Sequence, residues 1–337
     1  MKIVIDSAIP YIKDRFSKET EVIYLPGKEI SADIIKDADA LIVRTRTICN
    51  ENLLKDSSIK LVATATIGTD HIEIPWCEAN NIIVCSAPGC NAPGVAQYVF
   101  SSLFKAGFNP KTDTLGIIGY GNVGATVADW ARKMNIKCLI SDNPRKEVGY
   151  KDIDYVDIKT VLKNCDALTL HVPFTKEGNY PTNKLIAERE LSMMKPGSIL
   201  VNSSRGGVVE EYALKSFLSK GKLKAIVDVW ENEPEIDSEL VDLSFISTPH
   251  IAGYSTEGKM RATRMVLEAV KEVLGVEVNT SGLECNCPEN VMISRELIED
   301  SYNPEIDSRL LKKNILKFEQ IRNEYTYRHE PQFNTKD

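Results

Sequence analysis

A glycine-rich stretch, Gly119-Tyr120-Gly121-Asn122-Val123-Gly124, has a spacing that could bind a dinucleotide. It follows an apolar run typical of a strand and precedes residues with helical spacing. In this pattern the first glycine permits a tight turn, the second lets the backbone approach a pyrophosphate, and the third lets the helix pack close to the strand. The pyrophosphate would rest on the start of the helix, at Asn122 and Val123. The pattern alone is a weak signal, since any turn that needs glycines can produce it, but its place between a strand and a helix favours a nucleotide site.

Asp142 ends the next predicted strand, 18 residues after Gly124. A carboxylate at that point can accept hydrogen bonds from both ribose hydroxyls and would repel a 2′-phosphate. The sequence therefore predicts NAD rather than NADP as the cofactor. Because Arg145 lies three residues further on, NADP remains an alternative cofactor.

Three later strand ends carry ionisable groups: Asn202-Ser203-Ser204-Arg205-Gly206-Gly207, Asp228-Val229-Trp230-Glu231-Asn232-Glu233-Pro234 and Thr248-Pro249-His250-Ile251-Ala252-Gly253. Because the carboxyl ends of parallel strands face one crevice, all three should reach one site. Arg205 can bind a carboxylate through two hydrogen bonds, His250 can take a hydroxyl proton, and a glutamate can hold the imidazolium. These are the groups that hydride transfer from a hydroxy acid needs. Singly, each has an ordinary alternative, a hydrogen-bonded turn histidine or solvated loop charges at Glu231 and Glu233, so the hypothesis depends on the set.

The elements that must position these residues form two series of short strands with helices between them. The first series is predicted at Lys2–Asp6, Glu21–Leu25, Ala40–Thr45, Lys60–Thr66 and Ile82–Ala87, and the second at Leu115–Gly119, Cys138–Asp142, Ala167–His171, Ser198–Ser204, Ala225–Trp230 and Phe245–Pro249. Most are continuous apolar runs, which are typical of parallel strands covered on both faces. The pattern predicts an α/β protein with two doubly wound, parallel-sheet (Rossmann-like) domains.

Helical spacing sets the expected domain boundaries. One helix is predicted at Asn91–Phe104 and a long one at Thr256–Leu274. We expect an NAD-binding Rossmann domain at 92–257, a substrate-binding domain made of 1–91 and 258–280, and a small C-terminal extension at 281–337.

In that extension, Glu305–Tyr325 has the spacing of one charged helix with an apolar stripe of Leu311, Ile315 and Phe318. The stripe has no obvious partner in the same chain. It therefore predicts packing on a partner subunit or back on the body, and we expect a homodimer.

Composition excludes several classes of protein. The 337 residues are 43% hydrophobic, enough for a sizeable core, and contain no run of 18 apolar residues that could cross a membrane. The apolar run at the N-terminus is too short for a secretion signal, and a net charge of −7 with dispersed Lys and Arg argues against nucleic-acid or membrane partners. Cysteines that stand singly in apolar runs, such as Cys85, Cys138 and Cys165, indicate reduced, cytoplasmic usage. Cys285 and Cys287 have no neighbouring His or second pair, so no metal site is expected.

The order of these motifs resembles the D-2-hydroxyacid dehydrogenase family over about residues 1–275. The shared motifs are G-Y-G-N-V-G, N-S-S-R-G, D-V-W-E-N-E-P and P-H-I-A-G-Y. The resemblance implies Arg205, Glu233 and His250 as catalytic residues, Glu233 being the glutamate directly before the proline. It also implies NAD contacts from Asp142, Val172, Ser203, Ser204, Arg205, Asp228 and Gly253, and substrate contacts from Thr45, Thr66 and Tyr254.

Three further stretches resemble one member of that family, which acts on a four-carbon 2-hydroxy acid phosphorylated at its far end: V-R-T-R-T at 43–47, T-A-T-I-G-T-D-H at 64–71 and A-P-G-C-N-A at 87–92. Such a substrate needs a second anion-binding group, for which Arg44 is the candidate. Strand alternation predicts that Arg46 lies on the same face as Arg44. Thr45 stands where serine is usual, Gln97 stands where glutamate is common, and the tail is shorter than the family's C-terminal dimerisation domain. A 3-phosphoglycerate dehydrogenase, a glyoxylate/hydroxypyruvate reductase and a non-catalytic NAD-sensing protein remain the alternatives.

Overall fold

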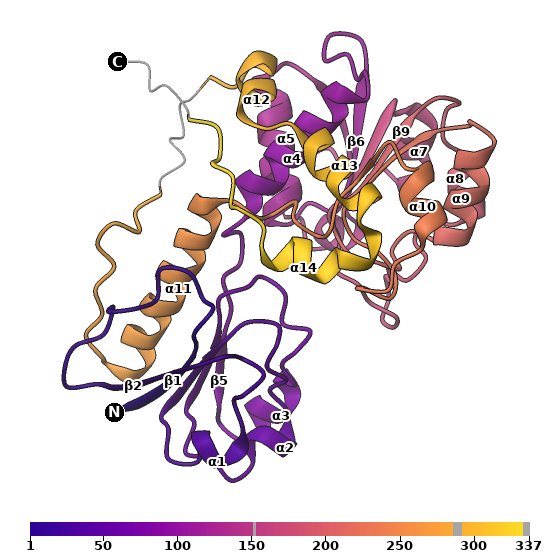
Figure 1. Cartoon of the computed structure of the whole chain (residues 1–337). Coiled ribbons are helices and arrows are strands. Elements are labelled where there is room, and N and C mark those ends of the chain that lie inside the picture. The colour runs from indigo at the N-terminus through magenta and orange to yellow at the C-terminus, as the bar shows by residue number, and fades with distance from the viewer. Residues whose placement is uncertain (151–152, 286–291, 333–337) are drawn as a thin grey trace. The chain divides into compact units, whose positions relative to one another are not determined.

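A computed structural model of the chain describes residues 1–150, 153–285 and 292–332, which form two compact units (Figure 1). The first unit contains Met1–Asn91 and Ser255–Cys287, and the second contains Ala92–Tyr254 and Pro288–Asp337. Each is built around a fully parallel sheet, so the predicted fold class is confirmed. A strand is present at each of the eleven predicted positions.

The first unit has a five-stranded sheet in the order β2-β1-β3-β4-β5. Its strands are β1 (Lys2–Asp6), β2 (Glu21–Leu25), β3 (Ala40–Val43), β4 (Leu61–Thr64) and β5 (Ile83–Cys85). Its helices are α1 (Ala32–Ile35), α2 (Glu51–Leu54), α3 (Ile74–Ala79) and α11 (Thr256–Leu274). Successive strand residues point to opposite faces: Ile3 and Ile5 pack in one apolar cluster with Val266 of α11, whereas Val4 packs in another with Ile35 of α1. Both faces are covered, which explains the continuous apolar runs.

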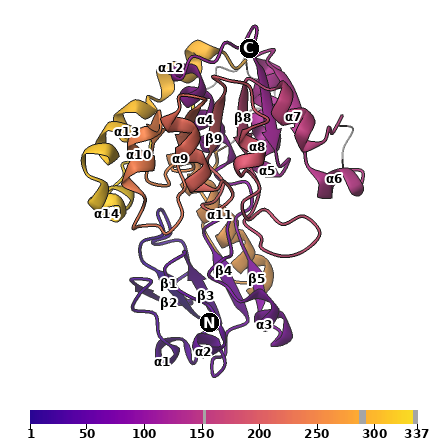
Figure 2. The same ribbon diagram turned by 90° about the vertical axis from the view of Figure 1, so that its right-hand side faces the viewer.

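The second unit has a six-stranded sheet in the order β11-β10-β9-β8-β6-β7. Its strands are β6 (Thr114–Ile118), β7 (Lys137–Ser141), β8 (Ala167–Leu170), β9 (Ile199–Asn202), β10 (Lys224–Val227) and β11 (Ile246–Ser247). Its helices before the C-terminal segment are α4 (Ala92–Lys105), α5 (Asn122–Lys133), α6 (Asn143–Glu147), α7 (Ile158–Asn164), α8 (Glu188–Leu191), α9 (Glu211–Ser219) and α10 (Ser238–Leu243). Side chains of α4 and α5 pack in one cluster with one face of the sheet, and those of α7, α8, α9 and α10 pack in a second cluster with the other (Figure 2). All six strands are parallel, so their carboxyl ends lie at one edge.

The C-terminal segment differs from its prediction. It forms α12 (Arg295–Ser301), α13 (Pro304–Lys313), a short 3-10 turn η1 (Ile315–Lys317) and α14 (Phe318–Asn323), not one helix over 305–325. The helix breaks at Asn314, whose backbone leaves the helical region (φ −139°) and whose side-chain amide donates to the carbonyl of Leu310. The break lets both Leu311 and Phe318 enter the apolar cluster beneath α9 and α10, where they are 0% and 1% exposed. The apolar stripe is therefore covered by its own unit, which confirms the second of the two predicted alternatives, packing back on the body, and the stripe does not support a homodimer.

Helices α12 and α13 lie beside α4, and α13 also lies beside β11 (Figure 1). This arrangement brings the C-terminal segment to β11, the strand that precedes the loop of His250. No helix in the described part of the chain is long and apolar enough to cross a membrane.

Candidate active site

The glycine stretch forms a turn between β6 and α5 that has room for a ligand. Gly119 has φ 91°, and a Cβ there would lie 2.4 Å from the carbonyl oxygen of His171. A Cβ at Gly124 would lie 2.0 Å from the carbonyl oxygen of Gly119, so the helix can approach the turn only without a side chain. At Gly121, by contrast, a Cβ would meet nothing within 4 Å. The structure thus shows two glycines required by close packing and one that faces open space at the start of α5, where Asn122 and Val123 are the first helical residues.

Asp142 lies at the end of β7, beside this turn. Its Oδ2 accepts a hydrogen bond from the N–H of Tyr120 at 2.7 Å, and its Oδ1 caps α6 by accepting from the N–H of Arg145 at 3.0 Å. The guanidinium of Arg145 lies 3.8 Å from the Asp142 carboxylate and stacks on the ring of Tyr150 at 4.0 Å. The carboxylate is therefore fixed at the position where a ribose is expected, and Arg145 is held by partners of its own.

Two residues that follow β8 and β9 are candidates for cofactor contacts: Val172 borders the glycine turn, and Ser203 has a buried hydroxyl without a hydrogen-bond partner among the described residues. A Cβ on Gly119 would come within 2.9 Å of Val172, so this side chain borders the turn. The hydroxyl of Ser203 is buried and has no hydrogen-bond partner among the described residues. Ser204, in contrast, donates from its N–H and its hydroxyl to Asn202 Oδ1, at 3.2 and 2.9 Å. A buried hydroxyl without a partner is costly unless a ligand satisfies it, and the donor set at these strand ends fits a dinucleotide.

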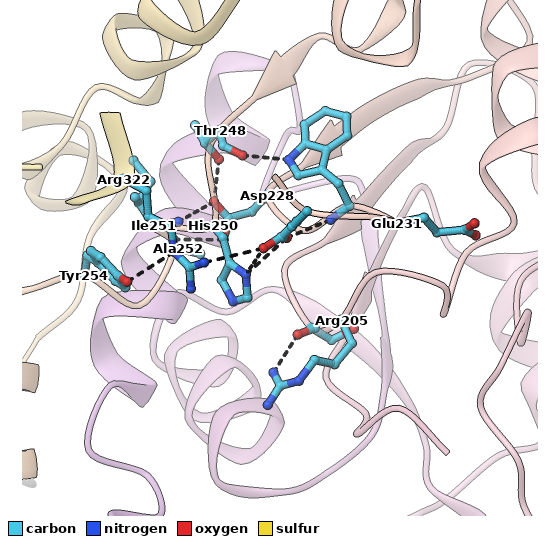
Figure 3. Close-up of polar contacts among 12 residues, drawn as sticks. Arg205, Asp228, Glu231, Thr248, His250, Ile251, Ala252, Tyr254 and Arg322 are labelled. Atoms are coloured by element: carbon cyan, nitrogen blue, oxygen red, sulfur yellow. Dashed lines mark hydrogen bonds and ion pairs between the residues drawn. The ribbon is translucent and has the colours of Figure 1, made fainter. Parts of the chain in front are cut away.

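His250 and Glu233 form a hydrogen-bonded pair in the loops that follow β11 and β10 (Figure 3). The imidazole Nδ1 lies 2.9 Å from Glu233 Oε2 and 3.1 Å from Oε1. Glu233 Oε1 also accepts from the N–H of Trp230 at 3.0 Å. Burial would raise the pKa of the Glu233 carboxyl, but these bonds and the charges of His250 and Arg322 outweigh it and hold the pKa below its ordinary value. Glu233 is therefore ionised at neutral pH.

Glu231, the other glutamate of this loop, points away from the imidazole (Figure 3). Its backbone N–H donates to Glu211 Oε1 at 2.7 Å. The structure thus brings Glu233, and not Glu231, to His250.

The loop that carries His250 is held by Asp228, which is 1% exposed. The carbonyl of Asp228 accepts from the N–H of His250 at 2.8 Å, and its carboxylate accepts from the N–H groups of Ile251 and Ala252 at 2.8 and 2.9 Å. The hydroxyl of Thr248 donates to the same carboxylate at 2.6 Å. These bonds hold His250 in the left-handed region, at φ 59°. The carboxylate of Asp228 therefore orders the loop as far as Ala252, and the NAD contacts of Asp228 and Gly253 stay predictions.

Arg205 and Tyr254 lie near this pair in the second unit. Arg205 Nη1 donates to the carbonyl of Ser204 at 2.8 Å, and Figure 3 shows the guanidinium folded back toward that carbonyl. The hydroxyl of Tyr254 accepts from Arg322 Nε at 3.3 Å.

The substrate residues predicted in the first unit follow β3 and β4. Arg44 Nε lies 3.0 Å from Asp6 Oδ2, where the Asp6 side chain is fully buried and that of Arg44 is 30% exposed. Strand β3 ends at Val43, and residues 45 and 46 lie in a turn, so the argument that strand alternation places Arg44 and Arg46 on one face is wrong. Thr45 is exposed, and the hydroxyl of Thr66 donates to the carbonyl of Gly68 at 3.0 Å.

No group of three or more His, Cys, Asp or Glu side chains in the described residues is arranged to hold a metal ion. Cys287, half of the Cys285/Cys287 pair, lies outside the described residues.

Residues 97–252 match the family described as "D-isomer specific 2-hydroxyacid dehydrogenase, NAD binding domain". The chain is also 43% identical to the erythronate-4-phosphate dehydrogenase of Bacteroides fragilis, over 98% of this chain and 97% of that one. This chain belongs to the D-2-hydroxyacid dehydrogenase family. The family expected from the motifs is confirmed, and the protein is an NAD-dependent dehydrogenase. The erythronate-4-phosphate dehydrogenase of Escherichia coli O157:H7 is 44% identical over 82% of this chain and 74% of its own.

Solved structures of dehydrogenases share the fold. An NAD⁺-bound 3-phosphoglycerate dehydrogenase of Entamoeba histolytica is 26% identical with a TM-score of 0.65, over 80% of this chain and 94% of that one. A D-lactate dehydrogenase of Aquifex aeolicus, complexed with NAD and lactic acid, is 25% identical with a TM-score of 0.62, over 82% and 96%. The cofactor of this dehydrogenase is NAD.

Sequence reasoning missed two arginines that this dehydrogenase places against its candidate active site. Arg322 Nη1 lies 3.6 Å from Glu233 Oε2, and Arg328 donates to backbone carbonyls of the loop that follows His250. Both stand in a charged segment where an arginine is ordinarily solvated, so nothing in their local pattern marks them. For Arg328 the sequence offers one clue, Gln97, which departs from the family pattern and whose side-chain oxygen accepts from Arg328 Nε at 2.9 Å.

Proposed function

We propose that this dehydrogenase oxidises 4-phospho-D-erythronate to 2-oxo-3-hydroxy-4-phosphobutanoate with NAD, a step in the biosynthesis of pyridoxal phosphate (vitamin B6). The observation that supports the chemistry best is the hydrogen bond between His250 Nδ1 and Glu233, in the same unit as a glycine turn that has room for a dinucleotide and at the same carboxyl edge of its parallel sheet. The relatives named erythronate-4-phosphate dehydrogenase, at 42–44% identity, support the substrate.

The orientation of His250 assigns its role in this proposal. Because Nδ1 donates to the ionised Glu233, the neutral imidazole carries its lone pair on Nε2. Nε2 takes the proton of the substrate's 2-hydroxyl, and Glu233 stabilises the imidazolium that forms. Bound NAD supplies the acceptor for the hydride that leaves C2.

Arg205 binds the C1 carboxylate and the developing carbonyl oxygen. A guanidinium suits this task because it offers two parallel N–H donors to a carboxylate. Its Nη1 donates to the carbonyl of Ser204 at 2.8 Å, which orients the guanidinium.

The cofactor residues of the proposal are those that surround the glycine turn. The backbone of the turn and of Asn122 and Val123 binds the pyrophosphate, and Asp142 accepts from the ribose hydroxyls. The remaining contacts are assigned to Val172, Ser203, Ser204, Arg205, Asp228 and Gly253. The buried hydroxyl of Ser203, without a partner among the described residues, supports this assignment.

The phosphate is assigned to Arg44, with hydroxyl contacts from Thr45, Thr66 and Tyr254 to the rest of the substrate. The buried Asp6 holds Arg44 through Nε, so the two terminal nitrogens are the donors left for an anion. An arginine already held in one orientation loses less entropy when it binds. We further propose a location in the cytoplasm and a homodimer, which is what the family resemblance implies and which does not rest on the apolar stripe of the C-terminal segment.

Initial rates of NADH formation test the proposal. We expect 4-phospho-D-erythronate to be oxidised far faster than D-erythronate, D-lactate or D-glycerate at equal concentration. Comparable oxidation of 3-phospho-D-glycerate would favour a 3-phosphoglycerate dehydrogenase. Equal rates with phosphorylated and unphosphorylated acids would remove the phosphate site, and NAD binding without turnover of any 2-hydroxy acid would favour an NAD sensor.

A further inference from the structure

Arg322, in the C-terminal segment, places a positive charge beside the carboxylate of Glu233, which is hydrogen-bonded to His250. Arg322, in α14, lies with Nη1 3.6 Å from Glu233 Oε2 and with Nε donating to the hydroxyl of Tyr254 at 3.3 Å (Figure 3). Its side chain is 20% exposed, and that of Glu233 is 18% exposed. A charge in such a partly desolvated place acts more strongly on its neighbours than one in water.

Arg328 fixes this segment to the loop of His250. Its guanidinium donates to the carbonyls of Ile251 at 3.0 Å, Tyr254 at 3.2 Å and Ala252, and to that of Gly94, at the start of α4, at 2.9 Å. It also lies over the ring of Tyr302, 4.4 Å from its centre. The loop is therefore held by two side chains: Asp228 accepts from its N–H groups, and Arg328 donates to its carbonyls. Because Arg322 belongs to the same segment as Arg328, these bonds also fix Arg322 relative to the loop.

Four charged groups lie around the imidazole and its partner. Glu233 comes from the loop after β10, Asp228 from the end of β10, Arg205 from the loop after β9 and Arg322 from α14; the neutral hydroxyl of Tyr254 completes the set (Figure 3). Burial raises the pKa of Asp228, although three donors on its carboxylate oppose the shift. Glu233 thus favours the imidazolium, Asp228 does so in its ionised form, and the cations Arg322 and Arg205 oppose it.

We propose that Arg322 is a positioning residue of the hydride-transfer reaction: it shares Glu233 with His250 and offsets part of the carboxylate charge, so that Glu233 orients the imidazole while stabilising the imidazolium less strongly. This inference rests on the proposed function for the role of His250 as the base. Without Arg322, the whole charge of Glu233 would act on His250 and stabilise the imidazolium. The base would then be protonated over more of the neutral range, and the oxidative reaction would need a higher pH.

NMR of histidine-labelled protein tests this inference without turnover, because the chain has only four histidines and a His250→Asn variant assigns the signal. We expect Arg322→Gln to raise the midpoint of the His250 titration by about 0.5–1 pH unit, the size expected for removal of a nearby charge. Arg322→Lys should recover most of the shift, because it retains the charge. Arg309→Gln is the control, since Arg309 lies in α13 of the same segment and bonds only to the carbonyl of Glu305 among its described contacts.

The acidic limb of the pH profile of kcat/KM for the oxidative direction should move by the same amount in Arg322→Gln, with the KM for NAD unchanged. A folded Arg322→Gln variant with a wild-type titration midpoint overturns the inference, and so does a lysine variant that titrates like the glutamine variant. If the midpoint shifts but the wild type oxidises no 2-hydroxy acid, the proposed function fails and the charge relationship stands. If the wild type turns over and the midpoint does not move, the function stands and the inference fails.

Discussion

His250 Nδ1 lies 2.9 Å from Glu233 Oε2, whereas Glu231, two residues earlier in the same loop, turns its side chain away from the imidazole (Figure 3). The loop therefore contains two glutamates, of which Glu233 is the one hydrogen-bonded to the histidine. Replacing each glutamate in turn is a matched test of the mechanism.

Glu233→Gln should lower kcat by about 10²–10⁴-fold, because a neutral amide cannot stabilise the imidazolium and can orient the wrong tautomer. Glu231→Gln should retain kcat within about twofold. Steady-state kinetics at saturating NAD measure both. A loss in Glu231→Gln equal to that in Glu233→Gln would show that the loop tolerates no change, and the assignment of Glu233 would lose its support.

The glycine turn gives a second matched pair. Gly124→Ala should destabilise the second unit, because the new Cβ would meet the carbonyl oxygen of Gly119 at 2.0 Å. Gly121→Ala should fold normally, since a Cβ there meets nothing within 4 Å, but should weaken NAD binding if a pyrophosphate occupies that space. Thermal unfolding and calorimetric titration with NAD separate the two effects. Unchanged NAD affinity in Gly121→Ala would place the pyrophosphate elsewhere.

Stability should depend on pH through Glu211, which starts α9 and accepts from the N–H of Glu231. Burial, followed by the charges of Glu231 and Asp237, raises the pKa of Glu211 to about 7 from an ordinary 4.5. Between these values the folded state binds more protons than the unfolded state, so this contribution is present below pH 4.5 and is lost as the pH rises to about 7. Glu211→Gln should therefore unfold at a higher urea concentration than the wild type at pH 8, with a smaller difference at pH 5.

Glu235→Gln, which changes an exposed glutamate near the same loop, is the control for Glu211. It should follow the wild type at both pH values. The prediction fails if Glu211→Gln is no more stable than Glu235→Gln at pH 8.

Arg44→Ala should raise the KM for 4-phospho-D-erythronate by about tenfold or more and leave that for D-erythronate and the Kd for NAD unchanged. Because this change leaves the fully buried Asp6 without its described cation, it should also lower stability. Asp6→Asn combined with Arg44→Ala removes that penalty and should keep the loss of phosphate selectivity. An unaltered ratio of the two KM values in the double variant would remove Arg44 from the phosphate site.

The sequence predicted the strands and the reacting groups because both depend on local pattern. Continuous apolar runs such as Ile3–Ile5 identify strands that are buried on both faces, and glycines within a strand–turn–helix context identify the turn at Gly119. Since parallel strands present their carboxyl ends at one edge, His250 and a glutamate of the loop after the preceding strand could be placed together without coordinates, and the family resemblance selected Glu233 over Glu231.

The C-terminal segment could not be predicted in the same way, because its structure depends on distant partners. The break at Asn314 follows from the burial of Leu311 and Phe318 in a core formed by other elements, which helical spacing does not encode. Arg322 and Arg328 acquire their roles only by packing on residues 89 and 77 positions earlier, Glu233 and Ile251, so their sequence context resembles that of solvated charges. Arg44 lies just beyond β3, and an alternation rule that holds inside a strand does not extend into the turn that follows.

The most direct test of the central claim is the fate of the hydrogen on C2 of the substrate. With 4-phospho-D-[2-²H]erythronate and unlabelled NAD, we expect one deuterium in each NADH formed, measured by mass spectrometry. His250→Gln should lower the rate by about 10²–10⁴-fold with the same labelling. NADH that forms without deuterium, or wild-type enzyme that binds NAD and the substrate without forming NADH, would contradict hydride transfer from C2 at this site.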